Sequence, residues 1–362
     1  MGQKIRIVLT CGLFLLLLGL WAVSWWMWNT LDSMPSPVNQ MEASLKENLP
    51  FHSFFRSLHS RVEILLGKTY VDGIYLQGDS LVEELPEPDQ QVISQSLKAL
   101  QSFCEPYRQK TYFMAVPTRS EFLNFSFVGY ENAWSQRGFI KDLMERLNGY
   151  VTEIDLYAAL TEADQEETYF KTETLWTGKG AYLGYEAFAS RVGLYPKRLE
   201  RYNMEIISHT FRGSLSRSLN YAAGGEDHID LYYDPYLPDA VEVKKISNLG
   251  AQSSNSLYFR EWLDTDQQQR IFLGEPVPLT FITSSVVNEK KLLLFGDDFS
   301  TVLAPYLLRN YSEVLLVDLS LLTADTAKQI NPEDYDQILF VYSTKTLSQS
   351  MELQNLEMLL SR

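Results

Sequence analysis

The feature that most constrains the fold of this chain is an alternation of short apolar segments with amphipathic helical ones. Residues 111–116, 291–295, 313–319 and 337–342 are rich in apolar side chains, as buried strands are. The run at 291–295 is followed at 299–309 by a segment with helical character. Strands that alternate with helices favour a parallel sheet joined by right-handed crossovers. The sequence therefore predicts an α/β fold in which helices flank a parallel sheet.

Further elements are expected beside this sheet. Amphipathic helices are predicted at 89–109 and 135–147, and a third begins at an N-cap on Thr177. A closing helix is expected at 347–360. Between 203 and 285 short β-like runs alternate with Gly, Asn, Ser and Pro, which predicts a β-rich insertion beside the sheet.

The amino terminus has the pattern of a membrane anchor. Residues 7–28 are almost wholly apolar and long enough to span a bilayer, and basic residues before them place residues 1–6 in the cytoplasm. A cleaved signal peptide is the alternative, but the run is long and no small-residue cleavage site follows it. We therefore expect a signal anchor at 7–28, a stalk at 29–48 and an extracytoplasmic domain at 49–362, in a single-pass protein of the cell membrane.

Charge and cysteine content exclude several classes of function. The net charge of -15 at pH 7 argues against nucleic acid or an anionic membrane surface as a broad partner, because both would be repelled. A neutral or cationic ligand is compatible with it. Cys11 lies in the expected anchor and Cys104 is alone outside it, so no disulfide can form within the external domain. The four histidines lack ligand spacing, and we expect neither a metal site nor a cofactor.

Two short stretches, far apart in the chain, carry the functional signal. The first is Glu173-Thr174-Leu175-Trp176, which has the form of an Asp-x-His-Trp motif without its histidine. The second is Gly296-Asp297-Asp298, a Gly-Asp-x turn between an apolar strand and a helix. In α/β folds such turns lie at the carboxyl ends of strands, where ligand sites form. A Gly-Asp-Ser turn would present a nucleophilic serine, but here the third residue is Asp298.

From about residue 45 to its C-terminus, the chain resembles the DHHW family of bacterial envelope proteins. That family is similar to the SGNH-hydrolase-like proteins of alginate and other polysaccharide O-acetylation. The order of landmarks carries the resemblance, with Leu65-Leu66-Gly67-Lys68 and Val71-Asp72-Gly73-Ile74-Tyr75-Leu76 before the first stretch. Val116-Pro117-Thr118 also precedes that stretch, and Phe211-Arg212-Gly213-Ser214 lies between the two.

The resemblance implies a degenerate catalytic site. In active relatives a serine attacks an ester carbonyl, and a histidine oriented by an aspartate takes its proton. The serine position falls on Asp298, the aspartate on Glu173 and the histidine on Leu175, with Thr174 where DHHW members carry a second histidine. The family pattern is kept at Trp176, Gly296 and Asp297. These three residues, together with Glu173 and Asp298, form the expected binding pocket.

These departures predict a protein that keeps the fold of the family but lacks its catalytic base and nucleophile. Leucine cannot take a proton, and Asp298 would place negative charge where an oxyanion must develop. The expected function is a non-catalytic binding or accessory subunit in cell-envelope polysaccharide O-acetylation. By resemblance its partners would be a membrane-bound O-acyltransferase and an envelope glycan. The alternative is an active O-acetyltransferase or acetyl esterase that uses His209, His228 or Ser300 instead.

Simpler interpretations of the same residues remain open at this point. Asp298 and Thr177 have the residue types of helix N-caps, and Glu173 has that of an ordinary surface carboxylate. Glu173 and Asp298 could form an acid pair of the glycosidase kind, or bind a divalent cation together with Asp297. A purely structural interaction module is a third interpretation of the whole domain.

Overall fold

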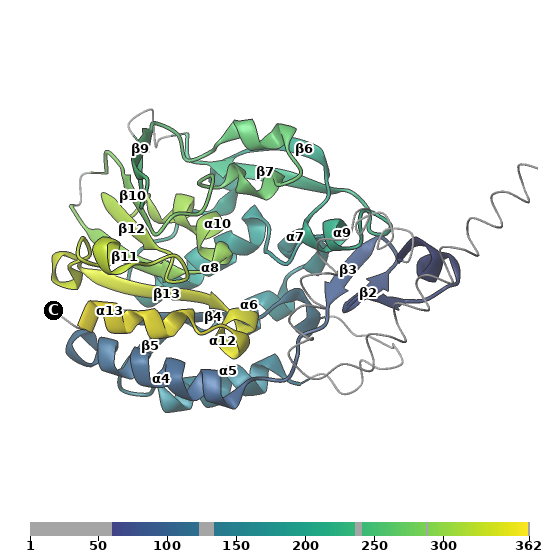
Figure 1. The fold of residues 1–362 in the computed structure, drawn as a ribbon. Coiled ribbons are helices and arrows are strands. Elements are labelled where there is room, and N and C mark those ends of the chain that lie inside the picture. Colours follow the sequence, from purple (N-terminus) through teal and green to yellow (C-terminus); the bar gives the residue numbers. More distant parts are fainter. Residues whose placement is uncertain (1–59, 123–133, 236–240, 287–288, 361–362) are drawn as a thin grey trace, which may run out of the picture. The chain divides into compact units, whose positions relative to one another are not determined.

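The computed structural model describes residues 60–122, 134–235, 241–286 and 289–360, whose centre is an eight-stranded sheet (Figure 1). In spatial order the strands are β5 (Thr152–Glu153), β4 (Thr111–Val116), β13 (Gln337–Ser343), β11 (Lys291–Gly296), β12 (Glu313–Val317), β10 (Leu279–Thr283), β8 (Glu242–Ser247) and β9 (Gly250–Ser254). The strands from β5 to β12 run parallel, whereas the pairs from β12 to β9 are antiparallel. The molecule is therefore an α/β protein with a mixed sheet.

Helices cover both faces of this sheet. One face carries α4 (Gln90–Cys104), α5 (Gln136–Arg146), α12 (Thr344–Gln349) and α13 (Glu357–Leu360), and the other carries α6 (Tyr157–Glu162), α8 (Gly178–Arg191) and α10 (Asp298–Leu307). Strand β11 shows why the apolar runs are continuous. Leu292 and Leu294 belong to the core under α8 and α10, while Leu293 and Phe295 belong to the core under α4. A strand buried on both faces needs apolar side chains at every position.

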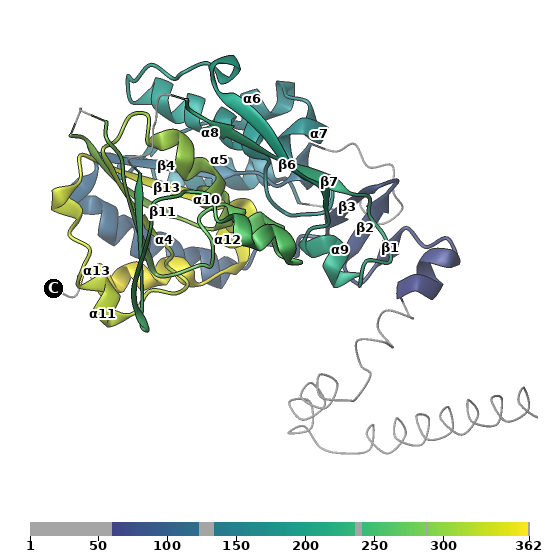
Figure 2. The ribbon, with the colours of Figure 1, turned by 90° about the horizontal axis from the view of Figure 1, so that it is seen from above.

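The predicted parallel strands and their helices are confirmed, with two corrections. The segment 203–285 is not simply an insertion beside the sheet, because β8, β9 and β10 extend the sheet itself. Only β6 (Asn203–Phe211) and β7 (Asp227–Tyr233) form a separate two-stranded ribbon (Figures 1 and 2). The expected closing helix is broken at Ser350, whose backbone is extended and whose hydroxyl accepts the Glu352 N–H at 3.2 Å. Such side-chain bonds compete with helix continuation.

A small three-stranded sheet precedes the main one in sequence. It is built from β1 (Tyr70–Val71), β2 (Ile74–Gln77) and β3 (Ser80–Glu83), and it packs against α9 (Ser214–Ser218). The Leu81 N–H donates to the Lys171 carbonyl at 2.8 Å, which joins this sheet to the first functional stretch.

The membrane attachment of the chain stays a prediction. The expected cytoplasmic tail at 1–6, anchor at 7–28 and stalk at 29–48 lie outside the described residues. Within the described part of the chain, no helix combines the length and apolar character that a bilayer span requires.

The indole of Trp176 joins the two functional stretches across the core. Its ring is fully buried, and its Nε1–H donates to the Phe299 carbonyl in α10 at 3.0 Å. Two glycines of α8 make room for it. A Cβ on Gly184 would lie 2.9 Å from Cη2 of this ring, and one on Gly180 would lie 2.3 Å from the Thr168 carbonyl oxygen.

We predict that Gly184→Ala destabilises the fold through Trp176 and that Trp176→Phe removes this effect. Overpacking of this kind costs about 1–3 kcal/mol. Phenylalanine lacks the far ring atoms that the new methyl group meets, although Trp176→Phe itself lowers stability by the lost hydrogen bond and a cavity. Urea-induced unfolding of the two single variants and the double variant gives the coupling free energy.

Gly180→Ala is the matched control. Its clashes are with the Thr168 carbonyl oxygen and with the Cβ of Trp176. Phenylalanine keeps that Cβ, so Trp176→Phe should leave the cost of Gly180→Ala unchanged. Additive free energies for the Gly184→Ala and Trp176→Phe pair would contradict this packing.

Candidate functional site

The two functional stretches meet at one cavity. Glu173, Thr174 and Leu175 come from the loop before α8, and Asp297 and Asp298 come from the turn between β11 and α10. All five side chains line the same pocket at the carboxyl end of β11, together with Gly296. The structure therefore brings together these sequence-predicted pocket residues, although Glu173 and Asp298 are far apart in the chain.

The β11–α10 turn is fixed by close packing and by helix capping. A Cβ on Gly296 would lie 2.5 Å from the Ser300 Cβ and 2.7 Å from the Val341 carbonyl oxygen, so no larger residue fits. The Asp297 carboxylate caps α10 by accepting the Phe299 N–H at 3.2 Å. It also accepts the Ser343 N–H and the Thr346 hydroxyl, each at 2.8 Å.

These bonds make Asp297 a structural anchor of the site. Burial raises the pKa of its carboxyl, although the hydrogen bonds from Ser343, Thr346 and Phe299 act in the opposite direction. Its oxygens already have donors from α10, from Ser343 at the end of β13 and from α12. Asp297 therefore holds three elements in place and is not the reactive group of the pocket.

Asp298 is the residue on which the resemblance places the nucleophile. It is the first residue of α10, its side chain is exposed, and none of the described residues donates a hydrogen bond to its carboxylate. The pocket walls reduce its hydration, and the carboxylates of Asp297, Asp318 and Glu173 repel its charge. Together these effects raise the pKa of Asp298 to about 6.

The loop that carries Glu173 is fixed by a buried aspartate. Asp227 in β7 accepts the Lys171 N–H at 2.7 Å, the Thr172 N–H at 2.8 Å and the Thr172 hydroxyl at 2.6 Å. Thr172 in turn accepts the Gly213 N–H at 2.9 Å. Sequence reasoning missed Asp227, because nothing local indicates that β7 folds back onto this loop.

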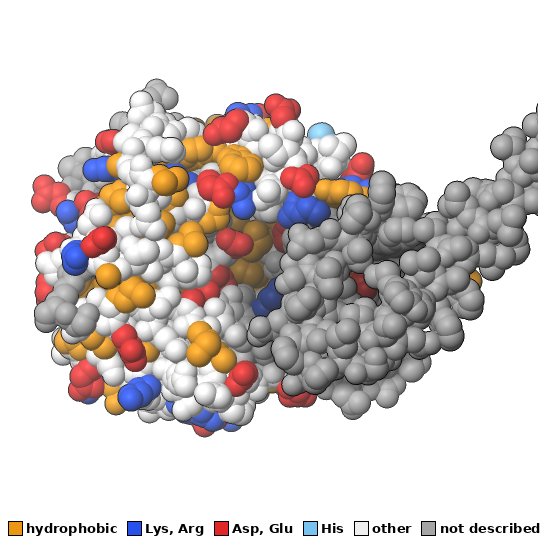
Figure 3. Space-filling view, viewed as in Figure 1, with side chains coloured by type: hydrophobic (Ala, Val, Ile, Leu, Met, Phe, Trp, Pro, Cys, Tyr) orange, Lys and Arg blue, Asp and Glu red, His pale blue; other side chains and the backbone are white. Residues whose placement is uncertain are grey.

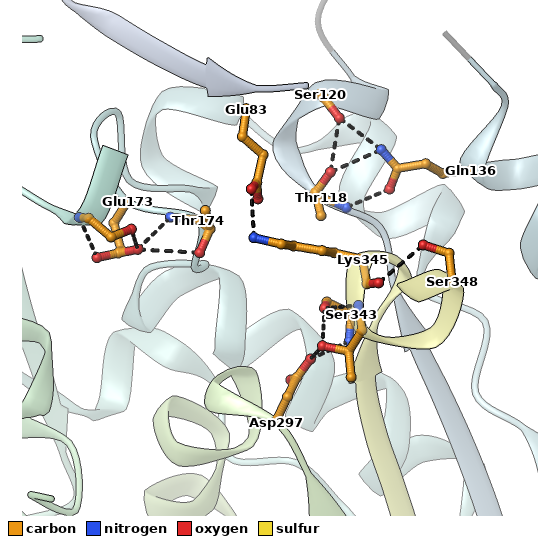
Figure 4. Close-up of polar contacts among 12 residues, drawn as sticks. Glu83, Thr118, Ser120, Gln136, Glu173, Thr174, Asp297, Ser343, Lys345 and Ser348 are labelled. Atoms are coloured by element: carbon orange, nitrogen blue, oxygen red, sulfur yellow. Dashed lines mark hydrogen bonds and ion pairs between the residues drawn. The ribbon is translucent and has the colours of Figure 1, made fainter. Parts of the chain in front are cut away.

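The Glu173 carboxylate is occupied by the N-terminus of α9. It accepts the Ser214 N–H at 2.8 Å and the Ser214 hydroxyl, and also the Thr174 N–H at 2.8 Å (Figure 4). Glu173 is only 5% exposed, so it is a buried, fully engaged side chain and not a surface carboxylate. Its partner at this site is a serine of α9, whereas the family pattern pairs the acid with a histidine.

The neighbours of Glu173 differ in their access to the pocket. Leu175 is 5% exposed and Thr174 half-buried, and both contribute to the pocket walls. Trp176 was expected in the pocket as well, but its side chain is fully buried and lies outside the lining. The indole serves to hold α10 to this loop.

The alternative catalytic residues are not placed for catalysis. Ser300 is fully buried, and its hydroxyl donates to the Asp297 carbonyl at 2.6 Å. His209 in β6 and His228 in β7 are exposed and line neither part of the pocket, and His228 pairs with Asp230 at 3.3 Å. The hydroxyl–histidine pair that the active alternative requires is therefore absent from the described residues of the site.

The pocket has two lobes that meet at Asp298. Lobe A has a volume of about 290 Å³, and its walls carry the cations Arg217, Lys245 and Arg270. Lobe B has a volume of about 250 Å³, and its charged residues are Glu83, Asp297, Asp298, Asp318, Lys345 and Glu352. The residues that line both lobes are Thr174, Leu175, Asp297, Asp298 and Asp318.

Lobe B contains one lysine that reaches across it. Lys345 in α12 extends to Glu83 in β3 and pairs with it at 2.6 Å (Figure 4). Beside this pair, Gln136 bonds to the Thr118 N–H at 2.8 Å and to the Thr118 and Ser120 hydroxyls, which fixes the wall. Lys345 and Asp318 both lie just after the carboxyl ends of strands. Because ligand sites in α/β folds form there, both residues could have been identified from the sequence.

No metal site is evident in the described part of the chain, and no basic area is evident on the face seen in Figure 3. No group of three or more His, Cys, Asp or Glu residues there is placed to hold a metal ion, Glu173, Asp297 and Asp298 included. On the face seen in Figure 3, the acidic and basic side chains of the described residues are scattered and form no continuous basic area.

Comparisons with known proteins agree on the fold. A family model described as DHHW protein matches residues 95–317. A DHHW family protein from Eubacterium siraeum superposes with a TM-score of 0.64 at 21% identity, and the match covers 79% of this chain and 97% of that one. PatB1 from Bacillus cereus, solved with a sulfonyl adduct, superposes with a TM-score of 0.65 at 18% identity, covering 77% and 97%. A search of curated proteins finds no match.

We predict that Asp298 lowers the stability of the fold at neutral pH. Its pKa of about 6 exceeds its ordinary value of 3.8, so the folded state holds the proton more tightly than the unfolded state. The free energy of unfolding therefore falls as pH rises from about 4 to about 6. Asp298→Asn should raise Tm by about 1–3 °C near pH 7.5 and leave it unchanged near pH 4.

The control is Glu162→Gln, which removes an exposed carboxylate outside the pocket. Its Tm relative to wild type should not depend on pH in this way. The same shift in both variants would show that overall charge, and not the pocket, is responsible.

Proposed function

The chain belongs to the DHHW family, and on that premise we propose that it is a non-catalytic binding or accessory subunit in the O-acetylation of a cell-envelope polysaccharide. Residues 7–28 would anchor it in the cell membrane with residues 49–362 outside. Its partners would be an envelope glycan and a membrane-bound O-acyltransferase. The observation that carries the proposal is one pocket lined by both Asp298 and Leu175. By resemblance, the nucleophile and base positions of the family fall on these two residues.

The substitutions act at two chemically separate steps. Leu175 offers no lone pair, so no group at that position can take a proton from an attacking hydroxyl. The Asp298 carboxylate lies at the N-terminus of α10, where the helix dipole of an active relative would face a developing oxyanion. A carboxylate there interacts with the positive end of the helix dipole in place of the oxyanion, and its charge repels the anionic intermediate. Loss of a complete triad lowers turnover roughly a million-fold in serine hydrolases.

Binding does not require those groups. The loop around Glu173 keeps its bonds to Asp227 and α9, and the turn around Asp297 keeps its bonds to β13 and α12. Both walls of the pocket are therefore held by hydrogen bonds that do not involve the missing nucleophile. This arrangement suits a protein that holds a glycan or presents it to a separate acyltransferase.

We predict that the wild-type chain does not hydrolyse acetyl esters and that restoring the motif introduces the activity. The measurements are turnover of p-nitrophenyl acetate and labelling by phenylmethanesulfonyl fluoride, followed as a mass increase of the intact protein. Wild type should match a heat-denatured sample in both. A variant with Asp298→Ser, Leu175→His and Glu173→Asp should take up the sulfonyl group, because it regains a serine beside a base.

Single variants identify any unexpected activity in the wild type. Turnover that is lost in Ser300→Ala would assign the nucleophile to Ser300. Turnover that is lost in Asp298→Asn would assign it to a carboxylate. Either result would overturn the non-catalytic proposal, whereas Asp298→Ser alone should remain inactive because it still lacks the base.

A further inference from the structure

Lobe B has an excess of carboxyl groups, and two of them are held in place by bonds to the surrounding elements. Glu83 pairs with Lys345, and Asp297 accepts three hydrogen bonds from α10, β13 and α12. The remaining three are Asp298, Asp318 and Glu352. These three residues determine the electrostatic character of the space that a ligand would enter.

None of these three carboxyl groups forms an ion pair with any of the described residues. Asp318 accepts the N–H and hydroxyl of Ser320 at 2.9 and 2.6 Å, and Glu352 accepts the Ser350 hydroxyl at 3.0 Å. The Asp298 carboxylate accepts no hydrogen bond from the described residues. Neutral donors of this kind do not cancel the mutual repulsion of three acidic groups in a small cavity.

The titration behaviour of the three groups reflects this repulsion. The pKa of Asp298 is raised to about 6 and that of Glu352 to about 8, in each case first by reduced hydration inside the pocket and second by neighbouring carboxylates. Burial also raises the pKa of Asp318. A positive charge placed among them would lower all three pKa values, so binding of a cation is favoured by the arrangement itself.

The chain already places one ammonium group in this lobe. The Lys345 side chain crosses the space between Thr118 and Thr174 and donates to Glu83 (Figure 4). The walls around it are rich in hydroxyl groups, and only Leu175 and Phe299 of the lining are apolar. Such a surface offers hydrogen bonds to a polyol and electrostatic attraction to an amine, with little apolar area for an acyl chain.

We propose that lobe B binds a sugar unit whose amino group is free and carries a positive charge, an inference that rests on the proposed function of glycan binding. The ammonium group lies among Asp298, Asp318 and Glu352, and the ring hydroxyls face the threonine and serine side chains of the walls. An N-acetylated sugar lacks the charge, and a uronate carries the opposite one. The lobe therefore selects a glycan that contains de-N-acetylated amino sugar.

Lobe A does not reverse this selectivity. Its three cations are already engaged, since Arg217 donates to the Asp266 carbonyl and Arg270 to the Glu275 carboxylate. Lys245 is buried and donates to the carbonyls of Leu273 and Glu275. All three side chains therefore already donate hydrogen bonds within the protein, and Arg270 is also paired with a carboxylate. An anionic sugar would also be repelled by the net charge of -15.

The test compares three tetrasaccharides of equal length by titration calorimetry with the full-length chain in nonionic detergent. They are a glucosamine oligomer, its N-acetylated counterpart and a galacturonate oligomer, each near neutral pH and physiological ionic strength. The glucosamine oligomer should bind about tenfold more tightly than the N-acetylated one, or better. Asp318→Asn should weaken its binding about tenfold, and Glu352→Gln should weaken it as well.

Glu162→Gln is the matched control, because it removes one carboxylate from the surface outside the lobe. Its affinity should equal that of wild type. Equal weakening in Asp318→Asn, Glu352→Gln and Glu162→Gln would show attraction to overall charge and would overturn the assignment. Thermal unfolding of each variant establishes that it is folded.

The outcomes separate this inference from the proposed function. Equal affinity for the glucosamine and N-acetylated oligomers, or preference for the galacturonate oligomer, overturns the amino-sugar assignment and leaves glycan binding in place. Absence of binding by all three oligomers overturns both.

Discussion

The geometry of the site depends on the contact between one indole and one backbone carbonyl. Trp176 follows the loop that carries Glu173, and its N–H bonds to Phe299 in the first turn of α10. Glycines of α8 let the ring approach closely. Because a buried indole N–H left without an acceptor is costly, the loop and the helix are held at a fixed separation. The bonds of Asp227 and Asp297 then fix each wall of the pocket around this contact.

The carboxylates of the pocket divide into two classes. Glu173 and Asp297 are buried and accept backbone N–H groups, so their charge stabilises the local fold. Asp298, Asp318 and Glu352 face the cavity without an ion pair to any of the described residues. The first class holds the pocket walls together through bonds that involve neither Leu175 nor Asp298. The second creates an acidic space that an active esterase of this type would avoid, since anionic intermediates would be repelled there.

Much of the fold could be predicted from local patterns. The strand at 111–116 has the predicted bounds, and Ser135 and Thr177 are N-caps of the helices predicted after them. The β8–β10 region was harder, because short polar strands do not show which neighbour they pair with. Leu279 lies opposite Val317 in an antiparallel register that depends on side chains far away in the chain. Ser350 ends a helix through a local hydrogen bond that periodicity does not reveal.

The sequence alone determined which chemical groups stand at the motif positions: a leucine for a base, an aspartate for a nucleophile, and an acid one methylene longer than the family pattern. Residue identity is local information, so an imidazole at the site could come only from a histidine elsewhere in the chain. Tertiary structure decided what surrounds those groups. It gave Glu173 a serine of α9 as partner, buried Ser300, kept His209 and His228 out of the pocket, and placed Asp318 and Glu352 beside Asp298. Those neighbours come from separate strands and helices, and only the packing of the whole sheet brings them together.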